Sequence, residues 1–231
     1  MIIPCIDLMG GNVVQLVQGQ RQALKGAPPL ETLELFAGFP EIQVIDLDAA
    51  MGTGDNSVIV EQLCARARCR VGGGVRSTGR AAELVALGAH RIIVGTAAFT
   101  PELSHIVDAV GVEKLVIALD SKNGKVVVKG WKESTVFTAI DAIAALSSSC
   151  GGFLCTYVDK EGMMQGTDLE WFAQLRAATT HEITAAGGIT TLDDIKTLNS
   201  IDIHAAVGMA LYTGRLSLDE LRALNEDRLY G

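Results

Sequence analysis

The chain has 231 residues, of which 48% are hydrophobic and 20% are charged, and its formal net charge is −8. This composition is typical of a folded globular protein and excludes a largely disordered chain. The acidic balance argues against nucleic acid as a partner, and no apolar run approaches the roughly 18 residues of a membrane span. No basic leader precedes Ile2 and Ile3, so we expect a cytosolic protein.

Short apolar runs alternate with segments of helical periodicity along the chain. Eight of these runs are predicted strands, and they cover Ile2 to Asp7, Ile42 to Leu47, Cys69 to Val71, Arg91 to Val94, Lys114 to Leu119, Phe153 to Val158, Glu182 to Ala185 and Ile203 to Val207. Helices are predicted between them, for example over Gly79 to Leu87 and Ala139 to Leu146. Thr78, Asp168 and Thr191 stand where helix N-caps are expected.

Eight such strand and helix units in this length predict an α/β protein with a (β/α)₈ TIM barrel. An open doubly wound sheet is the alternative, because it has the same order of elements.

An internal repeat favours the closed barrel. Six pairs of residues recur with an offset of 113 residues, or 114 for one pair: Asp7 with Asp120, Gly11 with Gly124, Asp46 with Asp159, Asp48 with Glu161, Gly73 with Gly187, and Gly95 with Gly208. Halves related by rotation occur naturally in a closed ring of strands, whereas an open sheet gives no reason for them. We therefore expect two tandem half-barrel repeats, about 1–113 and 114–231, that fold as one domain over residues 1–231.

Two carboxylates occupy matched strand ends and are the first candidates for catalysis. Asp7 ends the first predicted strand and Asp120 follows the fifth, so the two should face each other across the barrel mouth, where TIM-barrel sites lie. An isolated Asp at a strand end often only caps a loop. A pair related by the repeat favours proton removal on one side of a ligand and proton donation on the other.

Glycine-bearing turns after four strands are candidates for binding phosphate, because glycine lets backbone N–H groups approach an anion closely. The alternative is that they only permit tight turns. Their arrangement in two matched sets predicts a ligand with a phosphate at each end. The residues are Gly73, Gly74, Gly95 and Thr96 in the first half and Gly187, Gly188 and Gly208 in the second.

Four other side chains are weaker candidates. Thr156 and Glu161 lie near the end of the sixth predicted strand, where a threonine is more often structural. Trp131 could stack on a flat ligand ring, although it could equally pack in the core. Arg76 could contact phosphate, but isolated basic residues are usually solvated.

Five cysteines have spacings that match neither a disulfide framework nor a zinc site, so no metal is expected. They are predicted to be buried free thiols: Cys5, Cys64, Cys69, Cys150 and Cys155.

At these residues the chain resembles the ProFAR isomerase family of histidine biosynthesis, phosphoribosylformimino-5-aminoimidazole carboxamide ribotide isomerase. The similarity extends from Ile2 to about Tyr212. Eight segments carry it: IPCIDLMGGNVVQLVQG (3–19), VIDLDAAMGTGDN (44–56), VGGGVRS (71–77), IVGTAAF (93–99), ALDSKNGKVVVKGW (118–131), TYVDKEG (156–162), AAGGIT (185–190) and VGMALYTG (207–214).

The resemblance implies an Amadori rearrangement without metal or cofactor, in which an aminoaldose with two phosphates becomes an aminoketose. Asp7 then resembles the general base and Asp120 the acid that assists ring opening. Thr156 matches a position that supports the reaction, and Glu161 stands where relatives carry Asp, so it is a second candidate for delivering the proton. The glycines and Thr96 named above match phosphate contacts, and no obligatory protein partner is implied.

The chain departs from the family pattern at three positions: Gln15 stands at a frequent Arg, Gln43 at a frequent His, and Met209 at a frequent Lys or Arg. Relatives that also isomerise phosphoribosylanthranilate carry Arg near positions 15 and 129, so Gln15 and Lys129 predict a single-substrate enzyme. Two alternatives stay open: the cyclase subunit of imidazole glycerol phosphate synthase, which shares the repeat and both Asp residues, and a phosphate-binding barrel without activity.

Overall fold

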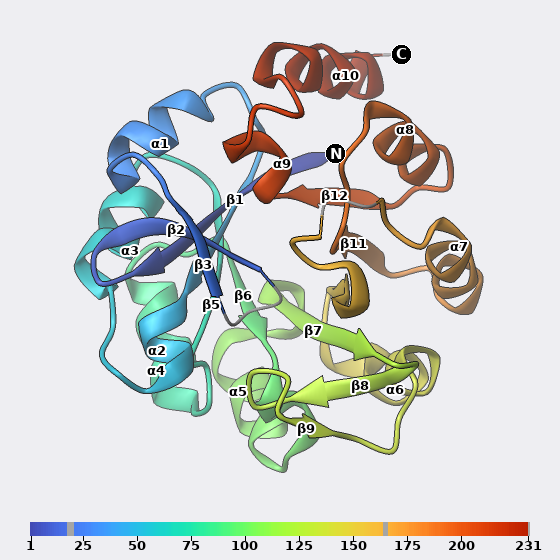
Figure 1. The fold of residues 1–231 in the computed structure, drawn as a ribbon. Helices are drawn as coiled ribbons and strands as arrows, with labels where there is room; N and C mark the ends of the chain where they lie inside the picture. Colours follow the sequence, from blue (N-terminus) through green and yellow to red (C-terminus); the bar gives the residue numbers. More distant parts are fainter. Residues whose placement is uncertain (18–20, 164–165, 231) are drawn as a thin grey trace.

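Eight parallel strands form a closed ring in the computed structural model, which describes residues 1–17, 21–163 and 166–230 (Figure 1). The pairing of the first ring strand with the last, and of β7 with β10, leaves no open edge in the ring. In ring order the strands are β1 (Ile2–Met9), β4 (Ile42–Asp46), β5 (Cys69–Gly72), β6 (Arg91–Val94), β7 (Leu115–Lys122), β10 (Gly152–Tyr157), β11 (Glu182–Ala186) and β12 (His204–Val207).

Helices surround this ring (Figure 1). The longer ones are α1 (Pro29–Leu35), α3 (Ser57–Cys64), α4 (Thr78–Ala86), α5 (Glu102–Val110), α6 (Ala139–Leu146), α7 (Leu169–Ala178), α8 (Leu192–Ser200) and α10 (Leu218–Tyr230). Short helical turns follow several strands or precede them: α2 (Leu47–Met51), η1 (Thr96–Phe99), η2 (Val112–Lys114), η3 (Ser147–Ser149), η4 (Val158–Lys160) and α9 (Met209–Tyr212). The TIM-barrel prediction is confirmed, whereas the tandem repeat and the domain boundaries stay predictions.

Two apolar layers hold the barrel together. The outer layer lies between strands and helices, and each helix contributes residues three or four positions apart, such as Ala81 and Leu84 of α4 or Phe172 and Leu175 of α7. The inner layer fills the barrel with side chains from most of the ring strands: Cys5, Ile45, Ile93, Val116, Ala118, Leu154, Ala186 and Ala206. Because both faces of each strand are buried, the strands read as continuous apolar runs in the sequence.

Two hairpins extend the ring strands that carry Asp7 and Asp120, and the sequence analysis missed both. β1 turns into β2 (Asn12–Val17) and β3 (Arg21–Lys25), while β7 turns into β8 (Lys125–Val128) and β9 (Glu133–Ser134). The predicted ends at Asp7 and Leu119 were therefore too early. Both turns have two consecutive residues of positive φ, Gly10-Gly11 and Asn123-Gly124, which is the backbone that two-residue hairpins require.

Two local predictions need correction. The N-cap of α4 is Ser77, whose hydroxyl accepts from the Arg80 N–H at 3.3 Å, and not Thr78. Thr78 instead donates from its backbone and its hydroxyl to Glu102, at 2.8 and 2.9 Å. The cysteines are free and four are buried as predicted, but Cys64 is only half-buried because it lies at the end of α3.

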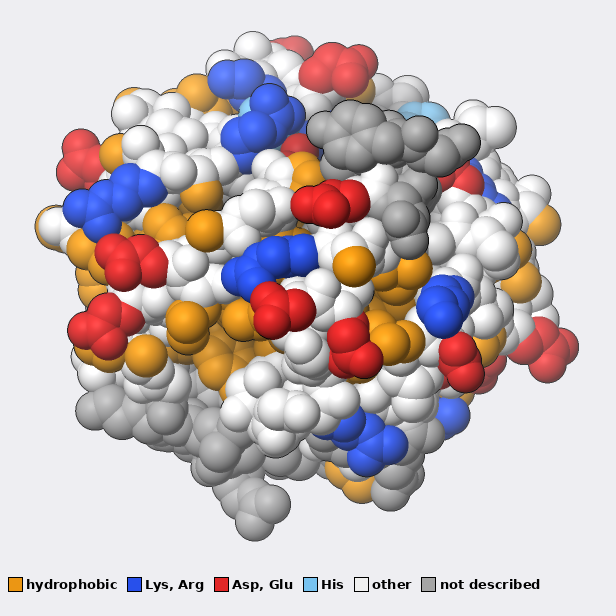
Figure 2. All heavy atoms as spheres, turned by 90° about the horizontal axis from the view of Figure 1, so that it is seen from above, with side chains coloured by type: hydrophobic (Ala, Val, Ile, Leu, Met, Phe, Trp, Pro, Cys, Tyr) orange, Lys and Arg blue, Asp and Glu red, His pale blue; other side chains and the backbone are white. Residues whose placement is uncertain are grey.

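The surface shown in Figure 2 carries acidic and basic side chains interspersed with apolar groups, without a large region of one sign. No helix among the residues outside the gaps at 18–20, 164–165 and 231 is long and apolar enough to cross a membrane.

A buried arginine closes the N-terminal end of the barrel. Arg70 in β5 is only 1% exposed, and it donates to Glu41, to Glu182 at 2.7 Å and to the Thr184 hydroxyl at 2.9 Å. Glu41 directly precedes the neighbouring strand β4, while Glu182 and Thr184 belong to β11 on the opposite side of the ring. A side chain that neutralises two carboxylates from different strands ties these strands together inside the barrel.

Replacement of Arg70 by Met should lower the free energy of unfolding by about 3–5 kcal/mol, because both carboxylates lose a buried cationic partner. Urea titration at pH 7 measures this loss. Arg68→Met is the matched control, since Arg68 also pairs with Glu41, at 3.5 Å, but its side chain is 62% exposed. That substitution should lower the free energy of unfolding by less than about 1 kcal/mol. Equal losses in the two variants would contradict the account.

Candidate active site

Asp7 and Asp120 lie on opposite sides of the barrel mouth. Asp7 belongs to β1 and Asp120 to β7, and these strands are four positions apart in the ring in either direction. Asp7 is level with Ile45, the second-last residue of β4, so it lies at the C-terminal end of the strands. A ligand in the mouth would therefore have one carboxyl on each side.

Two donors hold the Asp120 carboxyl. The indole N–H of Trp131 donates to Asp120 Oδ2 at 2.7 Å, and Thr156 is level with Asp120 on the neighbouring strand β10 and hydrogen-bonds to it. Burial raises the pKa of Asp120, while the hydrogen bonds from Thr156 and Trp131 oppose this increase. Three of the predicted site residues are thus brought together in one cluster.

The backbone of Trp131 itself is unusual. Its φ is +66°, in a region that bulky side chains rarely adopt, and the preceding residues Lys129 and Gly130 have φ of +55° and +66°. Strained conformations of this kind persist where the surroundings fix them. Here the indole bond to Asp120 is one such constraint, so the β8–β9 turn is tied to the mouth.

Glu161 contributes a third carboxyl to the mouth. It follows η4, and burial together with the negative charges of Asp7 and Asp120 raises its pKa to about 7. The Glu161 carboxyl therefore interacts electrostatically with both aspartates. Within the part of the chain that the structure describes, no three acidic, histidine or cysteine side chains form a group that could hold a metal ion.

Asp7 has a pKa raised to about 7, and the cause is burial alone. In contrast to Asp120, no hydrogen bond from the residues that the structure describes opposes this increase. A carboxyl with a pKa near neutrality is suited to accepting and returning a proton.

The glycine pairs after β5 and β11 have conformations and neighbours that exclude a side chain. Gly73 and Gly187 both have φ near +91° to +101°, and a Cβ on either would overlap the backbone of the preceding loop, at Asp46 or at Tyr157. The following residues Gly74 and Gly188 also have positive φ and backbone atoms at similarly short range. Close packing therefore requires glycine at all four positions, apart from any role in binding.

Gly95 and Gly208 differ from these pairs. They have nearly the same backbone angles, φ −97° and ψ −104° for Gly95 and φ −114° and ψ −97° for Gly208, and each begins a short helical turn. Nothing lies within 4 Å of a Cβ on Gly95, so packing does not explain this glycine. Backbone N–H groups at the start of such turns lack partners within the turn, which suits an anion.

The two sets of glycines lie on opposite sides of the mouth. We call Gly73, Gly74, Gly95 and Thr96 the first glycine site, and Gly187, Gly188 and Gly208 the second glycine site. The first follows β5 and β6 and the second follows β11 and β12, which are the diametrically opposed strands of the ring.

Arg76 and Thr96 form hydrogen bonds with other parts of the chain. Arg76 donates to the carbonyls of Ala49 and Ala50 at the end of α2, so its contact with phosphate stays a prediction. The Thr96 hydroxyl accepts from the Lys129 N–H at 2.9 Å, which links the first glycine site to the β8–β9 turn.

Gln15 and Gln43 are buried, at 4% and 6% exposed. Gln15 lies against Gly208, where its Oε1 would be 2.9 Å from an added Cβ, while Gln43 is level with Cys5 inside the barrel. Met209 is the first residue of α9, beside the second glycine site.

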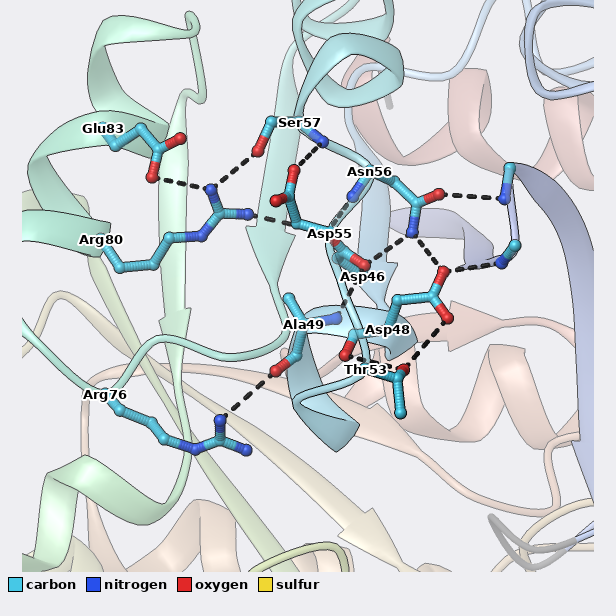
Figure 3. A network of polar contacts seen from close by, with 12 residues as sticks. Asp46, Asp48, Ala49, Thr53, Asp55, Asn56, Ser57, Arg76, Arg80 and Glu83 are labelled. Atoms are coloured by element: carbon cyan, nitrogen blue, oxygen red, sulfur yellow. Dashed lines mark hydrogen bonds and ion pairs between the residues drawn. The ribbon is translucent and has the colours of Figure 1, made fainter.

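Sequence reasoning did not identify Asn56 as important, yet it is the centre of a hydrogen-bond network beside the mouth (Figure 3). The repeat had marked Asp46 and Asp48, its two side-chain partners. The segment 44–56 ends at Asn56, but its contact with the β1 turn spans 45 residues, and no periodic pattern indicates such a contact.

A sequence profile of the family described as "Histidine biosynthesis protein" matches residues 1–217. The chain belongs to this family. A relative from Methanopyrus kandleri is 40% identical, over 98% of each chain. Relatives from Methanocaldococcus jannaschii and Thermus thermophilus are 38% and 35% identical, over 94% and 95% of this chain and 96% and 97% of their own. All three are named 1-(5-phosphoribosyl)-5-((5-phosphoribosylamino)methylideneamino) imidazole-4-carboxamide isomerase.

The desolvation of the Asp7 carboxyl predicts a pH-dependent loss of stability. Because its pKa is raised from 3.8 to about 7 in the folded protein, the fold binds this proton more tightly than the unfolded chain does. The Asp7 contribution therefore destabilises the fold increasingly as pH rises from about 4 to 7. Asp7→Asn should stabilise the protein at pH 8 by up to about 4 kcal/mol, and not at pH 4. Urea unfolding at the two pH values measures the difference.

Asp55→Asn is the control for this measurement. The Asp55 carboxyl is exposed and its pKa is lowered, chiefly by hydrogen bonds from Ser57, so this variant should gain no stability at pH 8. A pH-independent effect of Asp7→Asn would contradict the burial argument.

Proposed function

We propose that this protein is an aldose–ketose isomerase that converts the aminoaldose ProFAR into its aminoketose PRFAR in histidine biosynthesis. The observation that carries the proposal is geometric: two carboxyls face each other across the mouth, and two glycine sites face each other on the other pairs of strands. A substrate with a phosphate at each end matches this arrangement. Family membership and the isomerase names of the relatives support the same reaction.

The chemistry is a net transfer of protons without any change in composition. Donation of a proton to the ring oxygen breaks the C1–O bond and opens the aminoaldose to a protonated imine. Removal of the C2 proton then gives a neutral enolamine, which tautomerises to the aminoketose. In this proposal Asp7 takes the C2 proton. Its pKa near 7 leaves a large share of Asp7 ionised at neutral pH, while the carboxylate is still basic enough to accept a proton.

Ring opening needs an acid on the opposite side, and we assign it to Asp120, with Glu161 as the second candidate. Thr156 and Trp131 orient the Asp120 carboxyl, and burial raises its pKa. Glu161, with a pKa of about 7, is close to half protonated near neutral pH in the free protein. Thr156 supports the reaction through its bond to Asp120.

The two glycine sites hold the phosphates in this proposal. Backbone N–H groups at the turns that begin with Gly95 and Gly208 would donate to phosphate oxygens, with Thr96 and Arg76 as additional contacts. Trp131 would cover the ligand from the β8–β9 turn. Anchoring both ends fixes the central carbons between Asp7 and Asp120, which contributes to catalysis by orientation.

The substrate is a small bisphosphorylated ribotide, and the protein is proposed to act alone, without cofactor, nucleic acid, membrane or an obligatory partner, in the cytosol. Gln15 and Lys129 favour a single substrate. Gln15 is buried against Gly208, and the Lys129 ammonium pairs with Glu133 at 2.9 Å.

Asp7→Asn should reduce turnover of ProFAR by at least about 10²–10⁴-fold, because it removes the general base. Affinity for the product should change little, since Asp7 belongs to neither glycine site. Absorbance assays measure turnover, and calorimetric titration with PRFAR measures binding.

The wild-type protein must turn over ProFAR by itself in this assay. A folded wild-type protein that binds PRFAR but has no turnover would indicate a binding protein. Turnover of PRFAR that requires an added ammonia-producing subunit would indicate the cyclase.

A further inference from the structure

Asn56 makes four hydrogen bonds through one side chain and one backbone N–H (Figure 3). Its Nδ2 donates to Asp46 Oδ1 at 2.7 Å and to Asp48 Oδ2 at 2.9 Å, while its Oδ1 accepts from Gly11 N at 3.1 Å. Its backbone N–H donates to Asp46 Oδ2 at 2.7 Å. Asn56 is only 7% exposed; its two bonds to Asp46 are buried, and those with Asp48 and Gly11 are partly buried.

These contacts hold the turn of the hairpin that carries Asp7. Gly11 N binds Asn56, and the preceding Gly10 N binds Asp48 Oδ2 at 2.6 Å, so one amide and one carboxylate together satisfy both N–H groups of the turn. Asp7 is paired with Val14 across the same hairpin. We refer to Asn56 and Asp48 together as the turn clamp.

A rigid base supports the turn clamp. Asp46 is fully buried, caps α2 by accepting from Ala49 N at 3.1 Å, and lies 3.6 Å from Arg80 of α4. Arg80 in turn binds Ser57 and Glu83, at 2.9 and 2.8 Å (Figure 3). Asn56 therefore connects the β1 turn, through Asp46, to α2 and to Arg80 of α4.

The second hairpin is held differently. There Asn123 N, at the position that the repeat relates to Gly10, binds Asp159 Oδ2 at 2.9 Å. Asp48 and Glu161 are a repeat pair, yet Asp48 holds a backbone turn whereas Glu161 interacts with Asp7 and Asp120. The carboxyls of this pair therefore have different partners in the two hairpin regions.

We propose that Asn56 is a positioning residue for the reaction, which acts with Asp48 to fix the turn of the β1 hairpin and, through it, the strand that carries Asp7. This inference rests on the proposed function, in which Asp7 is the base. In that function Asn56 does not contact the substrate. The turn clamp would preserve both the direction of the Asp7 carboxyl and its shielding from water.

The shielding can be measured. Among the residues that the structure describes, titratable groups whose pKa values Asp7 influences include Cys5 of β1, Glu161 after η4 and Tyr212 of α9. None belongs to the turn clamp, and burial is the cause of the raised Asp7 pKa. Opening of the hairpin would admit water to Asp7, so its pKa should fall toward the value of an exposed Asp.

The test compares Asn56→Ala and Asp48→Ala with wild type. Both variants should lower kcat for ProFAR by about 10–100-fold, as expected for a misplaced catalytic group, with KM changed less than about threefold. The acidic limb of the kcat/KM profile should move to lower pH. Asp55→Asn is the control with no expected change, because Asp55 lies in the same loop but binds Ser57 rather than the β1 turn (Figure 3).

If Asn56→Ala fails to fold, Asp48→Ala decides, because Asp48 is half-buried and its loss leaves the pair of Asn56 with Asp46 intact. A folded Asp48→Ala variant with unchanged kcat and unchanged acidic limb would overturn the inference. An Asp48→Ala variant whose only change is a lower melting temperature would also overturn the inference.

A readout that does not depend on turnover separates this inference from the proposed function. The Asp7 carboxyl can be titrated by carbon NMR in wild type and in Asp48→Ala. A lower Asp7 pKa in the variant supports the turn clamp even if ProFAR is not the substrate. An unchanged pKa contradicts it even if wild type is an active isomerase.

Discussion

The transfer of three carboxyl groups from water into one barrel mouth is the constraint on which the rest of the structure depends. Burial raises the pKa of Asp7, Asp120 and Glu161, so each ionised group there carries a free-energy cost that must be offset elsewhere. The apolar layers and the Arg70 network at the opposite end of the barrel supply stability at a distance from the mouth. Destabilised functional groups on a stable scaffold are a common compromise in enzymes.

A closed ring of eight strands gives these groups their relative positions. Strands four places apart are opposed, so β1 faces β7 while β5 and β6 face β11 and β12. One axis across the mouth therefore joins the two aspartates, and another joins the two glycine sites. The two hairpins then fix the local positions. Trp131, after β8, hydrogen-bonds to Asp120, and the turn clamp holds the turn of the β1–β2 hairpin, which carries Asp7.

The sequence was sufficient for the ring, because strands buried on both faces read as apolar runs. The repeat paired Asp7 with Asp120, and the structure has them on opposed strands, while their roles stay predictions. It did not reveal the hairpins, although Asn123-Gly124 was an available turn signal. Arg70 was hidden within an apolar run, since its two carboxylate partners are distant in the chain. Asn56 could not be found either, because a hydrogen bond across 45 residues leaves no periodic pattern.

A crystal structure with the bisphosphorylated aminoketose PRFAR bound would test the central claim most directly. The account predicts one phosphate at the first glycine site, the other at the second, and the carbons derived from the sugar within hydrogen-bond reach of both Asp7 and Asp120. Both phosphates on one side of the mouth, or reacting carbons beyond the reach of either aspartate, would contradict it.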